Sequence, residues 1–385
     1  MPNFSGTISS KLPRVGTTIF STMSKLAMEH NAINLSQGFP DFECPQALVT
    51  AVNTAMKEGH NQYAPMPGVM RLREMIAEKT EELYGAKYNP ETEITVTAGA
   101  TQAIYTAIAA TIREGDEVII FEPAYDCYEP AIELNGGKTI YLQLQAPDYT
   151  INWNEVKKRV NHHTRMIIIN SPHNPCGSIL TAEDMKTLEK ITKNTEIIIL
   201  ADEVYEHIIF DGHRHESMAK YPNLASRSFI ISSFGKTFHT TGWKVGYCLA
   251  PKELMTEFRK VHQFNVFCVN TPMQYGIAEF LKNKSHYNDL GPFYQAKRDT
   301  FNKLLEGSRF SFVASPGTYF QLLSYEQITK EKDADYAIRL IKENGLASIP
   351  ISVFYHKPIF DNMLRFCFAK RDETLEKAAA ILRSI

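Results

Sequence analysis

The chain has 385 residues, of which 44% are hydrophobic and 22% charged, and its formal net charge is −2. This composition predicts a soluble, globular, cytoplasmic protein with a core large enough for more than one domain. The small net charge and the lack of a long basic run argue against a nucleic-acid partner. No run of eighteen apolar residues occurs, so the sequence predicts no membrane span, and no apolar stretch typical of a secretion signal follows the N-terminus.

Residues 1–28 are rich in Ser and Thr and contain no acidic residue, which is a composition shared with transit peptides. Pro13 and Gly16 would interrupt an amphipathic helix there, so we keep the cytoplasmic expectation. The six cysteines form no C-x-x-C pair and no zinc spacing. We therefore expect reduced, structural cysteines and no metal site.

Strand and helix patterns alternate between about residues 94 and 250. Continuous apolar runs predict strands at 94–97, 117–121, 165–169, 196–200 and 228–231, and helical patterns cover 100–113 and 181–193. Continuous runs suit strands that are buried on both faces, and strand–helix alternation suits a mostly parallel sheet. This region is therefore predicted to be an α/β domain.

The C-terminal third has a different pattern. After Pro251 it is mostly helical to about residue 308, followed by short strands at 319–323 and 364–368 and a helix from about residue 373. This order predicts a smaller α+β unit packed closely on the first.

Polar residues follow three of the predicted strands, at 170–175, 201–205 and 232–236. Because ligands bind at the carboxyl ends of strands in an open α/β sheet, these segments should converge on one crevice. Lys236 is the most informative, since an apolar strand precedes it and a segment with Gly242, Lys244 and Gly246 follows. A lysine in this place can form an imine with an aldehyde cofactor whose phosphate binds nearby, and pyridoxal phosphate is the candidate.

The motifs together resemble the class I aminotransferases of the fold-type-I pyridoxal phosphate enzymes over nearly the whole chain. Residues 171–177 match N-P-x-N-P-[TG]-G, Asp202 and Tyr205 match D-x-x-Y, and 242–246 match G-x-R-x-G after the lysine. The resemblance implies a mostly parallel seven-stranded sheet flanked by helices plus a smaller α+β domain. It also implies an N-terminal arm and part of the small domain at 1–44, a large cofactor-binding domain at 45–280 and a C-terminal small domain at 281–385.

The resemblance further implies how the cofactor is held. Lys236 would bind it as an imine and then move a proton between the substrate Cα and the cofactor. Asp202 would pair with the pyridinium nitrogen, Asn174 and Tyr205 would hydrogen-bond the phenolic oxygen, and Tyr125 would stack on the ring. Taken singly, each has an ordinary alternative: a solvated lysine, a helix-capping acid, or core and turn residues.

Phosphate binding is implied at the start of the 100–113 helix. Gly99, Ala100 and Thr101 would supply backbone N–H groups, and Ser233 and Lys244 would complete the site.

A second subunit is implied by Tyr63. It matches the family tyrosine that reaches the phosphate of the neighbouring subunit, which would make the active form a homodimer with shared sites.

Arg365 is the predicted carboxylate ligand, because an arginine flanked by apolar residues on a strand needs an anionic partner. Gly38 and Asn174 would also contact the substrate carboxylate. A structural ion pair is the alternative for Arg365.

The chain departs from the family pattern at four positions. Lys244 stands where many relatives have Arg, which replaces bidentate phosphate binding by a point charge. Ser171, Cys176 and Gly235 replace the usual Asn, Thr and Ser, and none of these changes removes a required chemical group.

Within the family, the motifs are most similar to bacterial methionine aminotransferases, near the kynurenine and glutamine transaminases. This implies ping-pong transfer of the amino group of methionine and aromatic amino acids to 2-oxo acids. The candidates for an apolar substrate pocket are Ile19, Phe20, Tyr63, Phe264, Phe267 and Tyr319.

Three other functions are compatible with parts of the sequence. One is a kynurenine or glutamine transaminase, and another is a lyase that cleaves the Cβ–S bond of cysteine S-conjugates on the same fold. The third is the effector domain of a transcription regulator, which needs a DNA-binding module for which residues 1–30 are too short.

Overall fold

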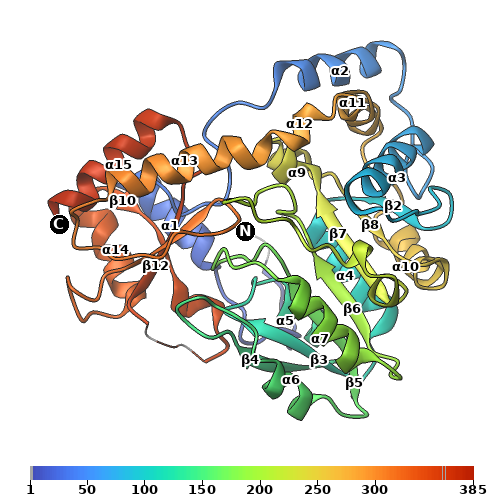
Figure 1. Cartoon of the computed structure of the whole chain (residues 1–385), viewed down its shortest axis with the longest axis horizontal. Coiled ribbons are helices and arrows are strands. Elements are labelled where there is room, and N and C mark those ends of the chain that lie inside the picture. The colour runs from blue at the N-terminus through green and yellow to red at the C-terminus, as the bar shows by residue number, and fades with distance from the viewer. Residues whose placement is uncertain (1–2, 358, 360) are drawn as a thin grey trace.

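A seven-stranded sheet forms the centre of the larger part of the molecule in the computed structural model, which describes residues 3–357, 359 and 361–385 (Figure 1). Its order is β2-β8-β7-β6-β5-β3-β4, and neighbouring strands are parallel except β8, which is antiparallel to β2 and β7. The mostly parallel α/β prediction is therefore confirmed. The strands are β2 (Ile94–Thr97), β3 (Glu117–Glu122), β4 (Lys138–Gln143), β5 (Thr164–Asn170), β6 (Ile198–Asp202), β7 (Ser228–Ser233) and β8 (Gly246–Leu249).

Apolar side chains on both faces of the sheet explain its continuous apolar strands. In β5, Ile167 and Ile169 pack into one core cluster, whereas Met166 and Ile168 pack into the cluster on the opposite face. Helices cover each face and bury both clusters. On the Met166 side these are α4 (Ala100–Thr111), α5 (Tyr128–Leu134) and α10 (Lys252–Asn265), and on the Ile167 side α3 (Met70–Tyr84), α6 (Trp153–Arg159) and α7 (Ala182–Thr192).

A smaller α+β unit lies beside the sheet, as predicted (Figure 1). Its antiparallel sheet has the order β11-β12-β9. The elements are β9 (Phe320–Ser324), β11 (Ile349–Pro350), β12 (Met363–Cys367), α13 (Leu290–Leu304), α14 (Asp333–Asn344) and α15 (Asp372–Ser384).

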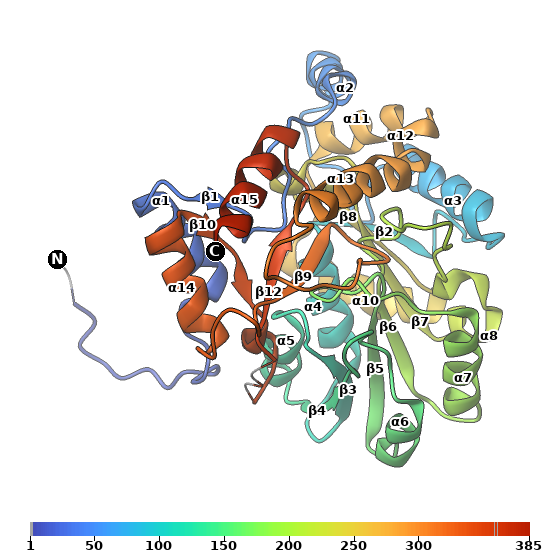
Figure 2. The same cartoon turned by 60° about the vertical axis from the view of Figure 1, so that its left-hand side comes forward.

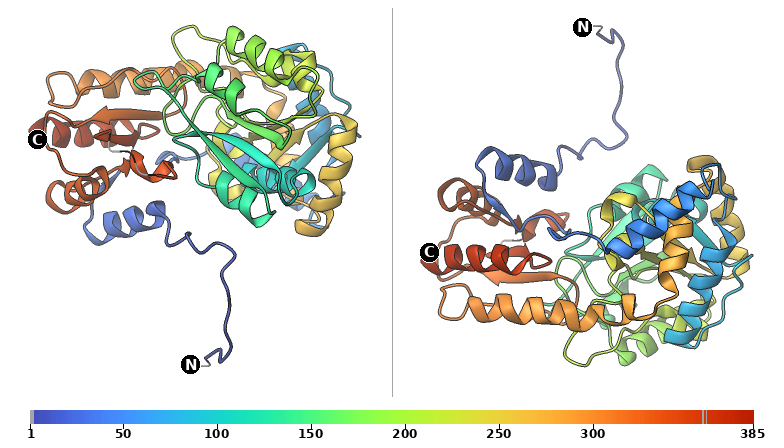
Figure 3. Two further views of the ribbon diagram at one scale, coloured as in Figure 1. Left: turned by 90° about the horizontal axis from the view of Figure 1, so that it is seen from below. Right: turned by 90° about the horizontal axis from the view of Figure 1, so that it is seen from above.

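The N-terminal segment joins this smaller unit. Strand β1 (Ile33–Asn34) pairs in parallel with β10 (Leu346–Ala347), and α1 (Ile19–Glu29) lies beside α14 (Figure 2). This pairing agrees with the assignment of 1–44 in part to the small domain, although the domain boundaries stay predictions. The segment before α1 runs away from the body of the molecule (Figure 3).

The remaining elements connect or flank the two units. Of the helices in the described ranges, none is long and apolar enough to cross a bilayer. These elements are α2 (Gln46–Lys57), α8 (Pro222–Ala225), α9 (Phe234–Thr237), α11 (Thr271–Leu281), α12 (Ser285–Asn288) and the 3-10 turns η1 (Met218–Lys220), η2 (Thr241–Trp243) and η3 (Ile351–Phe354).

Candidate active site

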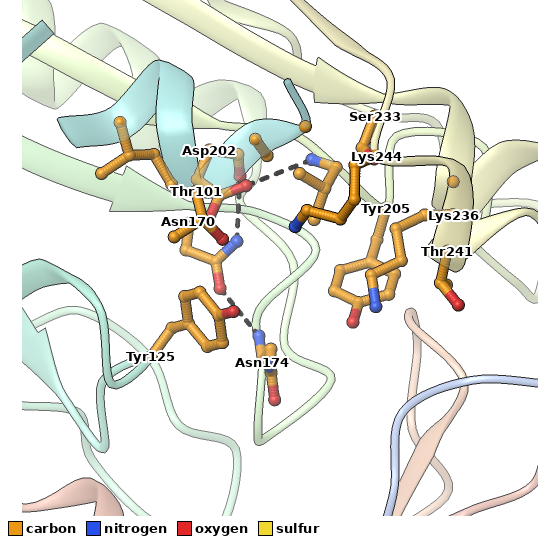
Figure 4. A pocket seen from close by; sticks show the side chains of 15 residues that line it. Thr101, Tyr125, Asn170, Asn174, Asp202, Tyr205, Ser233, Lys236, Thr241 and Lys244 are labelled. Carbon is orange, nitrogen blue, oxygen red and sulfur yellow. Dashed lines mark hydrogen bonds between the residues drawn. The ribbon is translucent and has the colours of Figure 1, made fainter. Parts of the chain in front are cut away.

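A pocket opens at the carboxyl ends of β5, β6 and β7, beside the N-terminus of α4 (Figure 4). It brings together all the predicted cofactor-binding residues except Tyr63. Five further lining residues were not predicted as site residues from the sequence: Ile104, Asn170, Val204, Gly235 and Thr241. The lining residues are Gly99, Ala100, Thr101, Ile104, Tyr125, Asn170, Asn174, Asp202, Val204, Tyr205, Ser233, Gly235, Lys236, Thr241 and Lys244.

Lys236 lies in the single turn of α9, directly after β7, so the sheet sets its position. Its Nζ donates to the Gly38 carbonyl at 3.0 Å and to the Tyr319 hydroxyl at 3.0 Å. Burial lowers the pKa of Lys236 from 10.5 to about 8, and the Arg365 charge acts in the same direction. A substantial part of the amine is therefore neutral near physiological pH, as a nucleophile or base requires.

Asp202 ends β6 and is 3% exposed. Its Oδ2 accepts from the Tyr128 hydroxyl at 2.6 Å, and its Oδ1 accepts from the Val204 N–H at 3.3 Å. Burial nevertheless raises the pKa of Asp202 from 3.8 to about 6, because these two hydrogen bonds only partly offset desolvation. The carboxyl group is thus ionised at neutral pH and sits where a buried cation would be its best partner.

Backbone geometry forms an anion cradle at the start of α4. Gly99, the N-cap, has φ +79°, and a Cβ there would lie 3.3 Å from the Lys244 Nζ. A Cβ at Gly246 would lie 2.7 Å from the Ser232 carbonyl and 3.2 Å from the Ala100 N. Only glycine allows this close approach, which places an ammonium group beside a helix N-terminus that lacks a side-chain cap.

Asn170 positions the loop that follows β5. Its side chain donates to the Asp202 carbonyl at 2.9 Å and accepts from the Asn174 N–H at 2.8 Å (Figure 4). Asn174 in turn accepts at Oδ1 from an Arg365 nitrogen at 2.7 Å. The loop therefore connects the pocket to β12.

Arg365 is almost fully buried in β12, and aromatic rings surround its guanidinium. The ring centroids of Phe320, Phe354 and Phe20 lie 4.0, 5.3 and 5.5 Å from Cζ. A second nitrogen donates to the Ser36 carbonyl at 2.9 Å, and in the described part of the chain Nε has no hydrogen-bond partner and no carboxylate lies within 4.0 Å. Arg365 is therefore better suited to bind an external anion through two donors than to form a structural ion pair within the chain.

The remaining predicted residues lie at different places. Tyr63 is 82% exposed outside the pocket, where its ring contacts Phe267 at 5.2 Å, and Phe264 is 91% exposed. Ile19 and Phe20 line a second hollow, which shares Tyr125 with the first pocket. Tyr319, predicted to line an apolar pocket, is fully buried, and its hydroxyl oxygen accepts a hydrogen bond from Lys236.

Comparison with known proteins identifies the family. The model of aminotransferase class I and II matches residues 30–382. The chain belongs to this family. This aminotransferase is 47% identical to methionine aminotransferase of Escherichia coli, with 98% of each chain covered. It is 33% identical to human kynurenine–oxoglutarate transaminase 1, with 93% of each covered.

A solved structure shows the same fold. It is an Escherichia coli protein whose reactivity identifies a methionine aminotransferase function, with a TM-score of 0.97, 46% identity and coverage of 98% of this chain and all of that one. The fold is therefore that of the fold-type-I aminotransferases, and the enzyme depends on pyridoxal phosphate like its family. Its residues fit that group: a glycine-lined anion cradle, a buried carboxyl group and a partly neutral lysine share one pocket.

Proposed function

We propose that this aminotransferase moves the amino group of methionine, and also of aromatic amino acids, to a 2-oxo acid by a ping-pong mechanism. The similarity to Escherichia coli methionine aminotransferase over nearly the full chain carries the proposal. The apolar rings of Phe20, Phe320 and Phe354 beside Arg365 support it, because they suit an uncharged substrate side chain next to a carboxylate.

The pocket residues divide the chemistry among them. Bound pyridoxal phosphate supplies an electron sink for the pair released when Cα loses a proton. Lys236 would anchor the cofactor and, once released, take up that proton at Nζ. Ionised Asp202 would pair with the protonated ring nitrogen, Tyr205 and Asn174 would hydrogen-bond the phenolic oxygen, and Tyr125 would stack on the ring.

The cradle at α4 would bind the phosphate. Gly99, Ala100 and Thr101 supply the helix N-terminus, and Ser233 and Lys244 supply a hydroxyl and an ammonium group. We propose that the partner subunit's Tyr63 completes this site in a homodimer, since Tyr63 is exposed and outside its own pocket.

Arg365 would bind the substrate α-carboxylate, with Asn174 and the Gly38 N–H as further ligands. The unpartnered Nε and the adjacent Nη2, which now donates to the Ser36 carbonyl, provide the two neighbouring donors of a bidentate pair. A cytoplasmic location stays a prediction from the sequence.

The test is a half-reaction in which each amino acid is added without acceptor and the absorbance of the lysine-bound cofactor is followed. Methionine and phenylalanine should discharge it at least about tenfold faster than aspartate, whose second carboxylate would be left unpaired among apolar rings. Lys236→Ala is the control and should lack this absorbance. A preference for aspartate would overturn the proposed donor.

The lyase alternative predicts a different stoichiometry. A Cβ–S lyase would release ammonia, pyruvate and a thiol from a cysteine S-conjugate without consuming a 2-oxo acid. Product analysis of the same reactions distinguishes the lyase from the aminotransferase. Preferred turnover of kynurenine or glutamine would favour a kynurenine or glutamine transaminase.

A further inference from the structure

Lys236, Gly38 and Tyr319 form a closed group of hydrogen bonds. The Lys236 Nζ donates to the Gly38 carbonyl and to the Tyr319 oxygen, each at 3.0 Å. The Tyr319 hydroxyl itself donates to the same carbonyl at 2.6 Å. Each distance is that of a well-formed hydrogen bond, so the amine is held at two points.

The three residues come from separate parts of the fold. Lys236 follows the central strand β7, Tyr319 directly precedes β9 of the smaller unit, and Gly38 lies between β1 and α2. Gly38 packs tightly, because a Cβ there would lie 2.7 Å from the Phe320 ring. The segment is also tied to the carboxylate site, since Arg365 donates to the carbonyl two residues earlier.

The two acceptors match the two N–H bonds of the neutral amine, so the amine can be held without its third proton. The Tyr319 proton is used on Gly38, so its oxygen can only accept from Lys236. Burial raises the pKa of Tyr319, and the neighbouring Tyr205 acts in the same direction, so Tyr319 keeps that proton. A neutral amine has two N–H bonds and one lone pair; two acceptors take both N–H bonds and leave the lone pair free.

We propose that Tyr319 and the Gly38 carbonyl form a docking site for the Lys236 amine whenever it is not bonded to the cofactor. The docking site holds the amine in the cofactor pocket with its lone pair available, which makes Tyr319 a positioning residue for proton transfer at Nζ. The inference rests on the proposed transamination.

Tyr319→Phe tests the docking site, because it removes the hydroxyl and keeps the ring that packs on Tyr205 at 5.1 Å. Tyr294→Phe is the matched control: Tyr294 is equally buried, its ring lies 5.6 Å from that of Tyr319, and its hydroxyl contacts His239 instead. In Tyr319→Phe the methionine half-reaction should slow about tenfold, the effect of one hydrogen bond. The methionine dissociation constant should not change, and the isotope effect with α-deuterated methionine should rise.

A second readout uses the cofactor-free enzyme. The pH dependence of Lys236 acylation, resolved by peptide mass spectrometry, should have its midpoint at a lower pH in Tyr319→Phe than in the wild type. The direction follows because a lost acceptor destabilises the ammonium form more than the amine. Tyr294→Phe should match the wild type.

Equal half-reaction rates and equal midpoints in the two variants would overturn the docking site. If Tyr319→Phe does not fold, 3-fluorotyrosine can replace Tyr319, because it keeps a hydroxyl that accepts more weakly. This variant should lower the midpoint of Lys236 acylation by a smaller amount. An unchanged midpoint would again overturn the docking site. Failure of the proposed function is distinguishable, because the wild type itself would then not react with methionine.

Discussion

Burial brings the pKa values of the two central ionisable residues close to neutral. It raises the pKa of Asp202 to about 6 and lowers that of Lys236 to about 8. Between these values the carboxyl group is mainly ionised and the amine is partly neutral, which is the combination that transamination needs. Burial of the ionised Asp202 and of the Lys236 amine therefore lowers the folding stability of the enzyme.

Asp202→Asn should reveal this cost in the cofactor-free enzyme. Because folding raises the pKa of Asp202 from 3.8, its stabilising contribution is complete below pH 4 and is lost as pH rises through about 6. At pH 8 the variant should be more stable by up to about 3 kcal/mol, at about 1.4 kcal/mol per pKa unit, and the gain should vanish near pH 4. Activity should fall at least about a thousandfold, since the ring nitrogen loses its counter-charge.

Urea unfolding at pH 8 and near pH 4 measures this effect. Glu196→Gln is the control, because the Glu196 side chain is 93% exposed and its loss should leave stability nearly unchanged. A variant no more stable than the wild type at pH 8 would contradict the argument.

At the scale of elements, one buried ion pair joins α3 to the sheet. Lys79 on α3 and Glu206, in the turn after β6, lie 2.7 Å apart and are each about 5% exposed or less. Glu206 also accepts from Tyr84, Ser232 and Tyr247 at 2.5, 2.7 and 2.9 Å. Burial opposes ionisation of Glu206, but the charge of Lys79 and the hydrogen bonds from Lys79 and Tyr84 keep the pKa of Glu206 well below the ordinary value. The network fixes the turn that carries Tyr205.

Lys79→Met should destabilise the enzyme by about 3–5 kcal/mol, because it leaves Glu206 charged and unpaired in the core. Adding Glu206→Gln should restore much of the loss, since it removes the unpaired charge and keeps an acceptor for the hydroxyl groups that bond to Glu206. The control is Lys158→Met, which breaks an exposed pair of the same 2.7 Å length and should cost less than about 1 kcal/mol. Chemical denaturation measures all three, and equal losses in the two single variants would refute the explanation.

At the scale of the whole molecule, apolar groups remain exposed on the single chain. Tyr63 and Phe264 are 82% and 91% exposed, and Phe4 and Ile8, in the segment that extends from the body, are 73% and 82% exposed (Figure 3). Adjoining exposed apolar side chains are typical of surfaces that another chain covers, and the Tyr63 ring contacts that of Phe267, which is 42% exposed. They support the proposed homodimer.

Mixed dimers provide the test of shared sites. Lys236→Ala and Tyr63→Ala should each be impaired alone, whereas a purified mixed dimer should regain activity, because one of its sites then combines Lys236 of one chain with Tyr63 of the other. Lys236→Ala mixed with Asp202→Asn is the control and should stay inactive, since both residues serve the site of their own chain. No recovery in the first mixture would show that Tyr63 does not act across subunits.

Most of the fold could be predicted because it depends on local patterns. The five strands predicted in the α/β region were confirmed, since their apolar runs are buried on both faces of the sheet. Strand β4 was missed because it is only partly buried and polar residues interrupt its apolar run at both ends. Strand β8 was missed because it begins with Gly246, the last glycine of the 242–246 motif, and glycine is a weak strand former.

Local patterns along the chain predicted the α/β sheet and a crevice at the ends of its strands, because strand periodicity and the polar segments after strands are local properties. The resemblance to the aminotransferase family added ten residues of the pocket. Tertiary structure alone decided that Tyr128 contacts Asp202, that Tyr319 holds Lys236 and that Arg365 bonds to Asn174. These contacts span 74, 83 and 191 residues, and no local pattern distinguishes such a tyrosine from a core residue. The near-neutral pKa values of Asp202 and Lys236 also depend on tertiary structure, because burial is a property of the folded chain and not of the residue.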